Sequence, residues 1–234
     1  MIYLTGDAHG SFRRIGAFCR EAKTSRDDVL VLLGDAGINY FGGQRDAWNK
    51  VYLSELPVTL LCVHGNHERR AETIPSYKER PWRGGAVYAE DAYPNLLFAR
   101  DGDVYDLEGT RALVIGGAYS VDAEFRIPFR DWWPDEQPSA AVRARVEQKL
   151  DAIGWKVDAV LTHTAPLRYE PTEAFLPGID PETVDKSTER WLDAIERRLA
   201  YAQWFCGHYH VQKTVGRLRI LYEDWTRLAE PGGS

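Results

Sequence analysis

The amino-acid sequence predicts an α/β protein whose strands are buried in the interior. Short apolar runs rich in Val, Leu and Ile recur along the chain, and several are continuous rather than alternating, as in strands buried on both faces. Segments with the apolar spacing of amphipathic helices lie between some of these runs. With 234 residues, of which 44% are hydrophobic, the chain is long enough to bury a substantial core. We therefore expect sheets with helices on their outer sides.

The apolar runs are the expected strands, which alternate with helices in the first half of the chain and predominate in its middle. They span residues 2–5, 29–33, 58–63, 112–117, 158–163, 202–207 and 217–223. Three helical stripes are expected, formed by Phe12, Ile15, Cys19 and Ala22, by Val142, Val146, Leu150 and Ile153, and by Trp191, Leu192, Ile195 and Leu199. Ser11 is the expected cap of the first helix, and the QPS segment at 137–139 marks the start of the second.

The composition narrows the class of protein. The net charge is −6 and the basic clusters are short, whereas proteins that bind extended nucleic acid usually carry a basic stripe. No apolar run approaches the length of a membrane span, and the N-terminal segment has no features of a secretion signal. The three cysteines show no paired spacing, which favours a reducing cytoplasm over a disulfide framework. We expect one domain over residues 1–228 and a flexible tail at 229–234.

Two stretches, residues 119–139 and 164–183, are rich in proline, aromatic and charged residues and match neither a strand nor a helix. Loops of this length in a compact domain are usually functional, so we expect them to form lids or rims of a site. Trp132 and Trp133 would either stack on a base or anchor the loop, and the proline that follows them favours anchoring.

Polar residues that suit metal binding follow five of the expected strands. They are Asp7 and His9, Asp35, Asn66 and His67, His163, and His208 and His210. All six histidines of the chain lie in or beside these segments, a confinement that a purely structural role does not require. Ligand sites of open α/β sheets gather at the carboxyl ends of strands, so we expect these side chains to meet. Imidazole and carboxylate without thiolate suit Mn, Fe, Zn or Ni, and the donors suffice for two ions about 3.5–4 Å apart.

The segments Asp7-x-His9, Gly34-Asp35, Gly65-Asn66-His67-Glu68, His163 and Gly207-His208-x-His210 together resemble the complete motif series of the calcineurin-like metallophosphoesterases. The series spans residues 6–210 and is far more specific than any of its parts. The resemblance implies a four-layer α/β/β/α sandwich of two mixed β-sheets, with the metal site at the carboxyl ends of the strands. It also implies one ion held by Asp7, His9, Asp35 and His210, and a second held by Asp35, Asn66, His163 and His208.

The expected reaction is metal-dependent hydrolysis of a phosphate monoester or diester. We expect in-line attack on phosphorus by a hydroxide that bridges two divalent ions, with Asp35 and His67 as catalytic residues and manganese as the first choice of metal. His67 is not needed as a ligand, so we place it beside the leaving group as general acid or as donor to a phosphoryl oxygen. Two divalent ions would keep the site positive in an acidic chain. The expected partner is a small phosphorylated substrate or nucleotide, without membrane or extended nucleic acid.

The sequence departs from the protein Ser/Thr phosphatase branch, to which its GDAHG and GNHE segments are similar. Ile38 and Asn39 stand where that branch has an acid and an arginine, and His64 stands where it has another arginine. Asn39 and two loop arginines, Arg126 and Arg168, are therefore the candidates for substrate binding. A protein-phosphatase-like enzyme and a non-catalytic metal-binding scaffold remain alternatives, although every ligand position is filled. Whether His64 orients a ligand or only ends a strand stays open.

Overall fold

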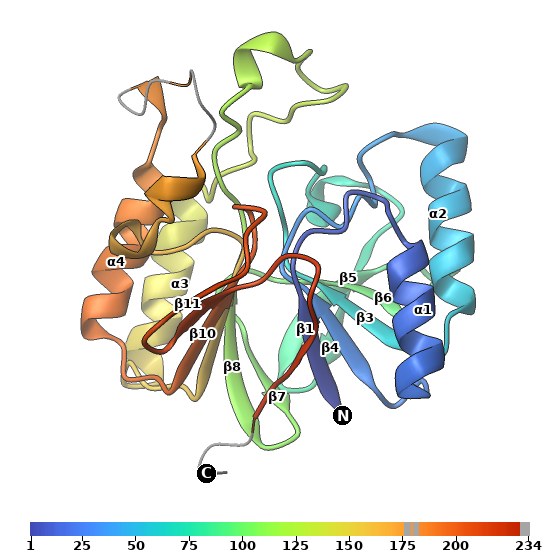
Figure 1. Ribbon diagram of the computed structural model, residues 1–234, viewed down its shortest axis with the longest axis horizontal. Coiled ribbons are helices and arrows are strands. Elements are labelled where there is room, and N and C mark those ends of the chain that lie inside the picture. The colour runs from blue at the N-terminus through green and yellow to red at the C-terminus, as the bar shows by residue number, and fades with distance from the viewer. Residues whose placement is uncertain (176–178, 180–182, 230–234) are drawn as a thin grey trace.

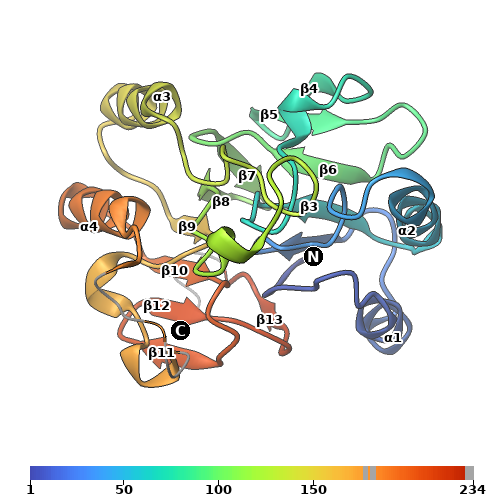
Figure 2. The same ribbon diagram turned by 90° about the horizontal axis from the view of Figure 1, so that it is seen from above.

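Two β-sheets form the interior of the computed structural model, which describes residues 1–175, 179 and 183–229. The first sheet contains β1 (Ile2–Thr5), β2 (Val29–Leu32), β3 (Thr59–Cys62), β4 (Lys78–Trp82), β5 (Gly85–Ala89), β6 (Leu96–Ala99) and β13 (Thr226–Arg227). The second contains β7 (Val104–Leu107), β8 (Thr110–Ile115), β9 (Ala159–Thr162), β10 (Gln203–Cys206), β11 (Lys213–Val215) and β12 (Leu218–Ile220). Helices α1 (Arg13–Ala22) and α2 (Gly43–Glu55) cover the first sheet, and α3 (Ala140–Ala152) and α4 (Ser187–Arg198) cover the second (Figures 1 and 2).

The predicted four-layer α/β/β/α sandwich is confirmed, and both sheets are mixed. The strand orders are β13-β1-β2-β3-β6-β5-β4 and β11-β12-β10-β9-β8-β7. Strands β1, β2, β3 and β6 pair in parallel in one sheet, as do β8, β9, β10 and β12 in the other, while antiparallel strands lie at the edges. The parallel strands therefore end at the same edge of each sheet, which brings the loops that follow them together (Figure 1).

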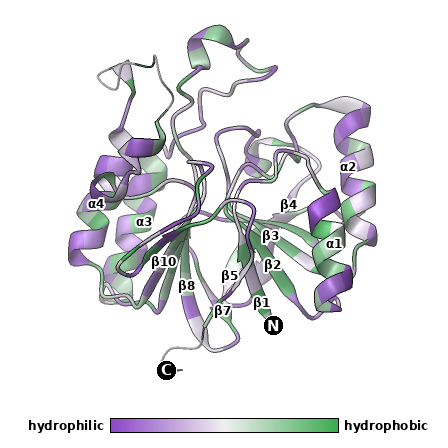
Figure 3. Ribbon diagram, in the orientation of Figure 1, coloured by the Kyte–Doolittle hydropathy of each residue, from purple (hydrophilic) through white to green (hydrophobic). Residues whose placement is uncertain are grey.

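Apolar side chains fill three layers of core between the sheets and the helices. In β1, for example, Ile2 and Leu4 face the other sheet, whereas Tyr3 packs with Phe18 on the α1 side. This is why the buried strands read as continuous apolar runs: both of their faces are covered. Figure 3 shows hydrophobic residues concentrated in the strands, and hydrophilic residues on the outer sides of the helices.

All seven expected strands and all three expected helices are present, but one cap was predicted wrongly. Helix α1 begins at Arg13 with Phe12 in the N-cap position and no capping side chain. Ser11 instead belongs to a tight turn, because its backbone N–H donates to the Ala8 carbonyl (2.7 Å). Ser139, in contrast, caps α3 by accepting from the Val142 N–H.

Helix α2 was not predicted, because its sequence lacks a clear apolar stripe. It buries Asp46 and Lys50 together with Leu53, and it exposes Trp48 and Val51. Asp46 is buried because its carboxylate accepts the backbone N–H groups that precede the helix, at Phe41 and Gly42 (3.2 and 2.7 Å). Lys50 is buried because its ammonium pairs with Glu90 (2.6 Å), so local capping and a tertiary ion pair replace the amphipathic pattern on which the prediction depends.

The described part of the chain contains no helix that is both long and apolar enough to cross a bilayer. The three cysteines, Cys19, Cys62 and Cys206, are buried and free. Of the tail expected at 229–234, only Ala229 is described, and its carbonyl accepts a hydrogen bond from Gln203 (3.1 Å).

Candidate metal centre

The structure brings the predicted metal ligands together between the ends of five strands. Three clusters have their ligand atoms within 4.8 Å of one another: Asp7, His9 and His210; His9, Asp35 and His67; and Asp7, Asp35 and His163. Asp35 lies between the two ends of the site, with its carboxylate 3.8 Å from His9 Nε2 and 3.5 Å from His163 Nε2. The arrangement therefore suits a ligand shared between two sides.

Asp7, His9 and His210 form one side of the site. The two imidazoles approach each other at 2.8 Å between their Nε2 atoms, and Asp7 Oδ2 lies 3.2 Å from His210 Nε2. Asp7 Oδ2 is buried and has no hydrogen-bond partner among the described residues, whereas Oδ1 accepts the backbone N–H of His208 (2.8 Å). Burial opposes ionisation, but His210 and His9 hold the pKa of Asp7 well below its usual value, so a charged oxygen faces the two rings.

His163 and Asn66 form the other side, and their hydrogen bonds fix which atoms face each other. His163 Nδ1 lies 2.7 Å from the Leu33 carbonyl, which only accepts, so the proton of a neutral ring is on Nδ1. Asn66 Nδ2 donates to Ser120 Oγ (2.9 Å), which turns Asn66 Oδ1 toward His163 Nε2 at 2.8 Å. Two lone pairs thus face each other without a proton between them, an arrangement that a cation would stabilise.

His208 adds a neutral imidazole beside this pair. Its ring centroid lies 5.0 Å from that of His163. Burial lowers the pKa of His208 to about 3, so the ring is uncharged and can act as a ligand at neutral pH. The residues present therefore fit divalent metal ions, as the chemistry of the sequence predicted.

Several ligands are held in a strained backbone conformation. His9, Asp35, His208 and His210 have φ angles of 46°, 46°, 69° and 52°, in the left-handed region that residues other than glycine rarely adopt. Such strain persists only where the surroundings enforce it, and it is concentrated at functional sites. The backbone therefore fixes these ligands independently of any bound ion.

Gly65 and Gly34 permit close packing around the predicted ligands. A Cβ atom on Gly65 would lie 2.1 Å from both the backbone nitrogen and Oδ1 of Asp35. A Cβ on Gly34 would lie 2.0 Å from Nδ1 of His163. Both glycines are required because ligands from neighbouring strands pass directly over them.

Comparison with known proteins decides the family. A family model described as calcineurin-like phosphoesterase matches residues 1–212, a range that includes every strand-end segment described above. The chain belongs to the calcineurin-like phosphoesterase family. Membership implies metal-dependent hydrolysis of phosphate esters. No curated protein sequence matches the chain.

Solved structures of similar fold cover most of the chain. TT1561 of Thermus thermophilus is 14% identical, with a TM-score of 0.53 over 94% of this chain and 87% of that one. A second structure is 16% identical, with a TM-score of 0.52 over 94% and 88%. Phosphopantetheinyl hydrolase from Mycobacterium tuberculosis is 15% identical, with a TM-score of 0.45 over 95% and 89%. Similarity at these identities concerns the fold alone.

Two buried carboxylates support the phosphoesterase site, and only one of them lies in a motif. Glu68 accepts the backbone N–H groups of Gly65 (2.9 Å) and Ala36 (3.1 Å), which ties the loops after β3 and β2 together. Glu136 accepts from Ser120 Oγ (2.5 Å), which in turn holds the amide of Asn66. These hydrogen bonds from Asn66 through Ser120 to Glu136 were not predicted from the sequence, because Glu136 lies far from Asn66 along the chain, in a loop without a motif.

Trp132 and Trp133 anchor this loop, as the favoured interpretation predicted. Trp132 Nε1 donates to Glu136 Oε2 (2.8 Å), and Trp133 is buried. The stretch 119–139 is therefore a structured support of the metal centre, and it also lines the pocket beside it.

His67 lies next to the shared carboxylate and contacts an arginine. Its backbone N–H donates to Asp35 Oδ1 (2.8 Å). Arg126 places its two terminal nitrogens 3.0 and 3.1 Å from the nitrogens of the His67 ring, and it also pairs with Asp122 (2.7 Å). Burial lowers the pKa of His67, and Arg126 lowers it further against the opposing effect of Asp35. The imidazole is thus held neutral beside a permanent cation.

The other candidates for substrate binding lie elsewhere. The Asn39 side chain exchanges hydrogen bonds with the Tyr77 hydroxyl (2.9 and 3.2 Å) and lines a separate cavity of about 510 Å³. Arg168 pairs with Asp193 (2.7 Å) and Glu196 (3.1 Å) of α4, away from the pocket. The structure therefore brings Arg126 to the metal centre but neither Asn39 nor Arg168.

His64 orients no ligand through a hydrogen bond. Both of its ring nitrogens are buried and without a hydrogen-bond partner among the described residues. Burial, with the neighbouring Arg70 and His163, lowers the pKa of His64 well below its usual value. It is a neutral packing residue at the end of β3.

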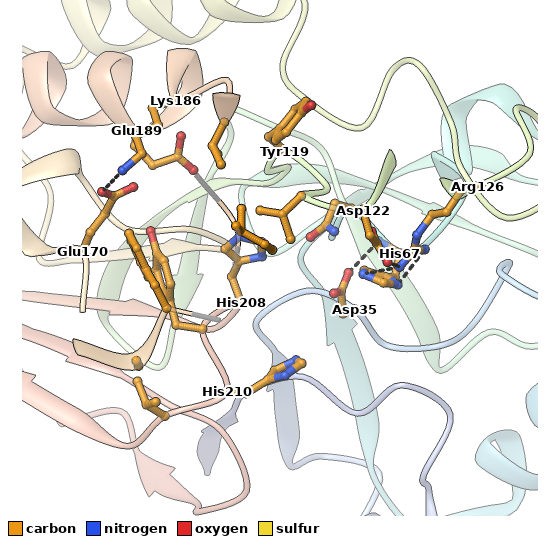
Figure 4. Close-up of a pocket in the computed structure, with 18 residues that line it drawn as sticks. Asp35, His67, Tyr119, Asp122, Arg126, Glu170, Lys186, Glu189, His208 and His210 are labelled. Carbon is orange, nitrogen blue, oxygen red and sulfur yellow. Dashed lines mark hydrogen bonds and ion pairs between the residues drawn. The ribbon is translucent and has the colours of Figure 1, made fainter. Parts of the chain in front are cut away.

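A pocket of about 500 Å³ opens beside the candidate ligands, a size suited to a small molecule. Figure 4 shows Asp35, His67 and Arg126 on one side of it and Glu170, Lys186 and Glu189 on the other, with His208 between the two groups. We refer to these sides as the metal wall and the far wall.

Proposed function

We propose that the protein is a dinuclear metal-dependent phosphoesterase that hydrolyses a small phosphate monoester or diester by in-line displacement. The observation that carries the proposal is the pair of places where metal-ligating atoms converge, at Asp7 with His210 and at Asn66 with His163. Asp35 lies between them. Two divalent ions, with manganese the first choice, would activate a water as hydroxide and neutralise charge on the phosphoryl oxygens.

The residues of the metal wall have separable tasks in this reaction. Asp35 holds the His67 backbone, so the ring is fixed relative to the ligands. The Arg126 guanidinium is a permanent donor suited to a phosphoryl oxygen, because it lies in the pocket and carries its charge at every relevant pH. His67 is then the residue beside the leaving oxygen, to which it would donate a hydrogen bond as a neutral ring or a proton from the fraction of the protein in which the ring is protonated.

A protein Ser/Thr phosphatase-like activity has less support. Ile38 is fully buried, and Asn39 bonds to Tyr77, so the two residues that replace the acid and arginine of that branch do not face the pocket. A non-catalytic scaffold would not require a full set of converging donors. We also propose a cytoplasmic location, which the free, buried cysteines support.

The test is hydrolysis of p-nitrophenyl phosphate and bis-p-nitrophenyl phosphate with added Mn²⁺, together with elemental analysis of bound metal. Wild type is expected to hydrolyse at least one ester. His67→Ala should lower kcat by about a hundredfold, the usual contribution of a general acid. Arg126→Ala should lower kcat/KM about tenfold, whereas Arg130→Ala, on the exposed rim of the same loop, should leave it unchanged. No hydrolysis with any divalent metal, together with no bound metal, would overturn the proposal.

A further inference from the structure

The far wall of the pocket differs in chemistry from the metal wall. Away from the metal ligands, the pocket lining is largely apolar and aromatic: Val121, Phe175, Val184, Val211 and the rings of Tyr119 and Tyr209. These residues come from the stretch 119–139, from the loop before α4, and from the two neighbours of His210 in the chain. Apolar walls of this kind exclude water from the part of a ligand that they cover.

The described cations that line the pocket are already paired. Lys186 donates to Glu170 Oε2 (2.8 Å), and its ammonium lies 5.0 Å from the centre of the Phe175 ring. Arg126 pairs with Asp122. A second phosphate group placed on the far wall would therefore meet carboxylates and apolar surface, and it would gain no cation that is free of an acidic partner.

One acceptor on the far wall lacks a donor. Glu189, in the first turn of α4, lines the pocket and is 4% exposed. Its Oε2 atom has no hydrogen-bond partner in the described part of the chain. Buried acceptors are almost always satisfied, so an unsatisfied one at a pocket wall indicates a ligand that supplies the donor. Burial, with Glu170 and Asp185 nearby, raises the pKa of Glu189 to about 7, although hydrogen bonds from its own backbone and from Thr164 oppose the rise; the charge of the carboxyl is thus incompletely stabilised.

We propose, building on the phosphoesterase function above, that the far wall binds the alcohol part of the substrate. That part is an apolar body carrying a hydrogen-bond donor, an amine, amide N–H or hydroxyl group, which meets Glu189 Oε2. The ester phosphate lies at the metal wall, and the apolar body lies against Phe175 and the valines. Nucleoside polyphosphates and sugar bisphosphates are excluded, because their second anionic group would face the far wall.

The experiment compares two esters that differ only in the donor. These are 4-(2-aminoethyl)phenyl phosphate and 4-ethylphenyl phosphate, whose phenol leaving groups are chemically alike. In wild type with Mn²⁺, kcat/KM should be about tenfold or more higher for the amine, the effect of one hydrogen bond to a buried carboxyl. A third ester, 4-(2-hydroxyethyl)phenyl phosphate, separates a preference for any donor from a preference for an amine.

Variants of Glu189 assign the preference to this residue. Glu189→Leu removes the acceptor at nearly constant volume and should bring the ratio between the amine and ethyl esters close to one. Glu189→Gln keeps an acceptor oxygen and should retain part of the ratio. Glu21→Leu, an exposed change on α1, is the matched control and should retain all of it. Thermal melting shows whether each variant is folded.

The outcomes separate this inference from the function on which it rests. If wild type hydrolyses the amine and ethyl esters with nearly equal kcat/KM, the inference is overturned and the phosphoesterase function stays intact. A ratio that survives Glu189→Leu would overturn it as well. If no ester is hydrolysed, the phosphoesterase function fails, and NMR titration of tyramine against 4-ethylphenol still tests the far wall. Equal binding of these two compounds would overturn the inference.

Discussion

The two walls of the pocket are built in different ways. On the metal wall, nearly every functional side chain follows directly after a buried strand, so its position is fixed by a hydrogen-bonded sheet. The far wall is formed by loops and by the start of α4, whose positions depend on packing between distant segments. On the function proposed above, the strand ends would handle the phosphate that all substrates share, and the loops would select the rest of the molecule.

The largest expected effect is on the metal wall, at Asp35. Asp35→Asn keeps the hydrogen bond that Asp35 accepts from His67 but removes the charge between the two sides of the site. Phosphoesterase activity should fall by more than about a hundredfold, because even residues that only support ligands contribute 10–100-fold. Elemental analysis should show less bound metal. Full activity in this variant would mean that the metal wall is not where the chemistry occurs.

A smaller effect is expected where the loop 119–139 supports the metal wall. Ser120→Ala removes the acceptor that orients Asn66 while nearly preserving volume. We expect metal affinity to fall about 10–100-fold, as for other partners of metal ligands. Metal titration of the apoprotein measures this, and Ser76→Ala, an exposed serine, is the control. Unchanged affinity would show that the sheets alone orient the ligands.

On the far wall, Glu189 is expected to make stability depend on pH. Burial raises the pKa of Glu189 from 4.5 to about 7, so the folded protein binds more protons than the unfolded chain between these values. Wild type should therefore lose stability as pH rises through this window, whereas Glu189→Gln does not titrate. The variant should gain about 2 kcal/mol relative to wild type between pH 5 and pH 8.

Urea unfolding at both pH values, with EDTA to remove metal, measures this difference. Because the difference between wild type and Glu189→Gln is compared at two pH values, any pH-independent free-energy cost of burying the glutamine amide drops out. Glu21→Gln on the exposed face of α1 should show no such change. Parallel pH profiles for wild type and Glu189→Gln would contradict the expectation.

The smallest effect is expected at Arg168. Its side chain is 39% exposed and pairs with Asp193 and Glu196, so Arg168→Ala should cost about 1 kcal/mol of stability or less. Hydrolysis of p-nitrophenyl phosphate should stay within about twofold of wild type, because Arg168 lies outside the pocket. A large loss of activity would show that loop arginines act on the substrate from beyond the pocket lining.

Much of the metal wall could be predicted from the sequence, because the two features that place its residues are local: an apolar run that forms a buried strand, and a polar residue just after it. A buried strand is recognisable as an apolar run, and the residue after it lies at the strand end whatever the rest of the fold does. Asp7, Asp35 and His163 were assigned in this way. The strained backbone at Asp35 and its close approach to Gly65 have no local signal, because they depend on neighbouring strands.

The far wall and the supports could not be predicted, because they depend on contacts between distant segments. Arg126 and Arg168 are equivalent in sequence, as arginines in long loops, and only packing decides that one reaches His67 and the other α4. Glu136 supports Asn66 across 70 residues of sequence. Helix α2 was not predicted partly for the same reason, since its buried Lys50 is paired with the distant Glu90.

The pairing of β1 with β13 has a consequence for how the protein folds. Tyr3 lies opposite Arg227, so β1 acquires this neighbour only when segments more than 200 residues apart have met. The ligands are likewise spread from residue 7 to residue 210. Pairings between such distant residues form slowly, because a long loop must close first. The candidate site therefore takes shape only after segments about 200 residues apart have come together, which makes its assembly a late event in folding rather than a local one.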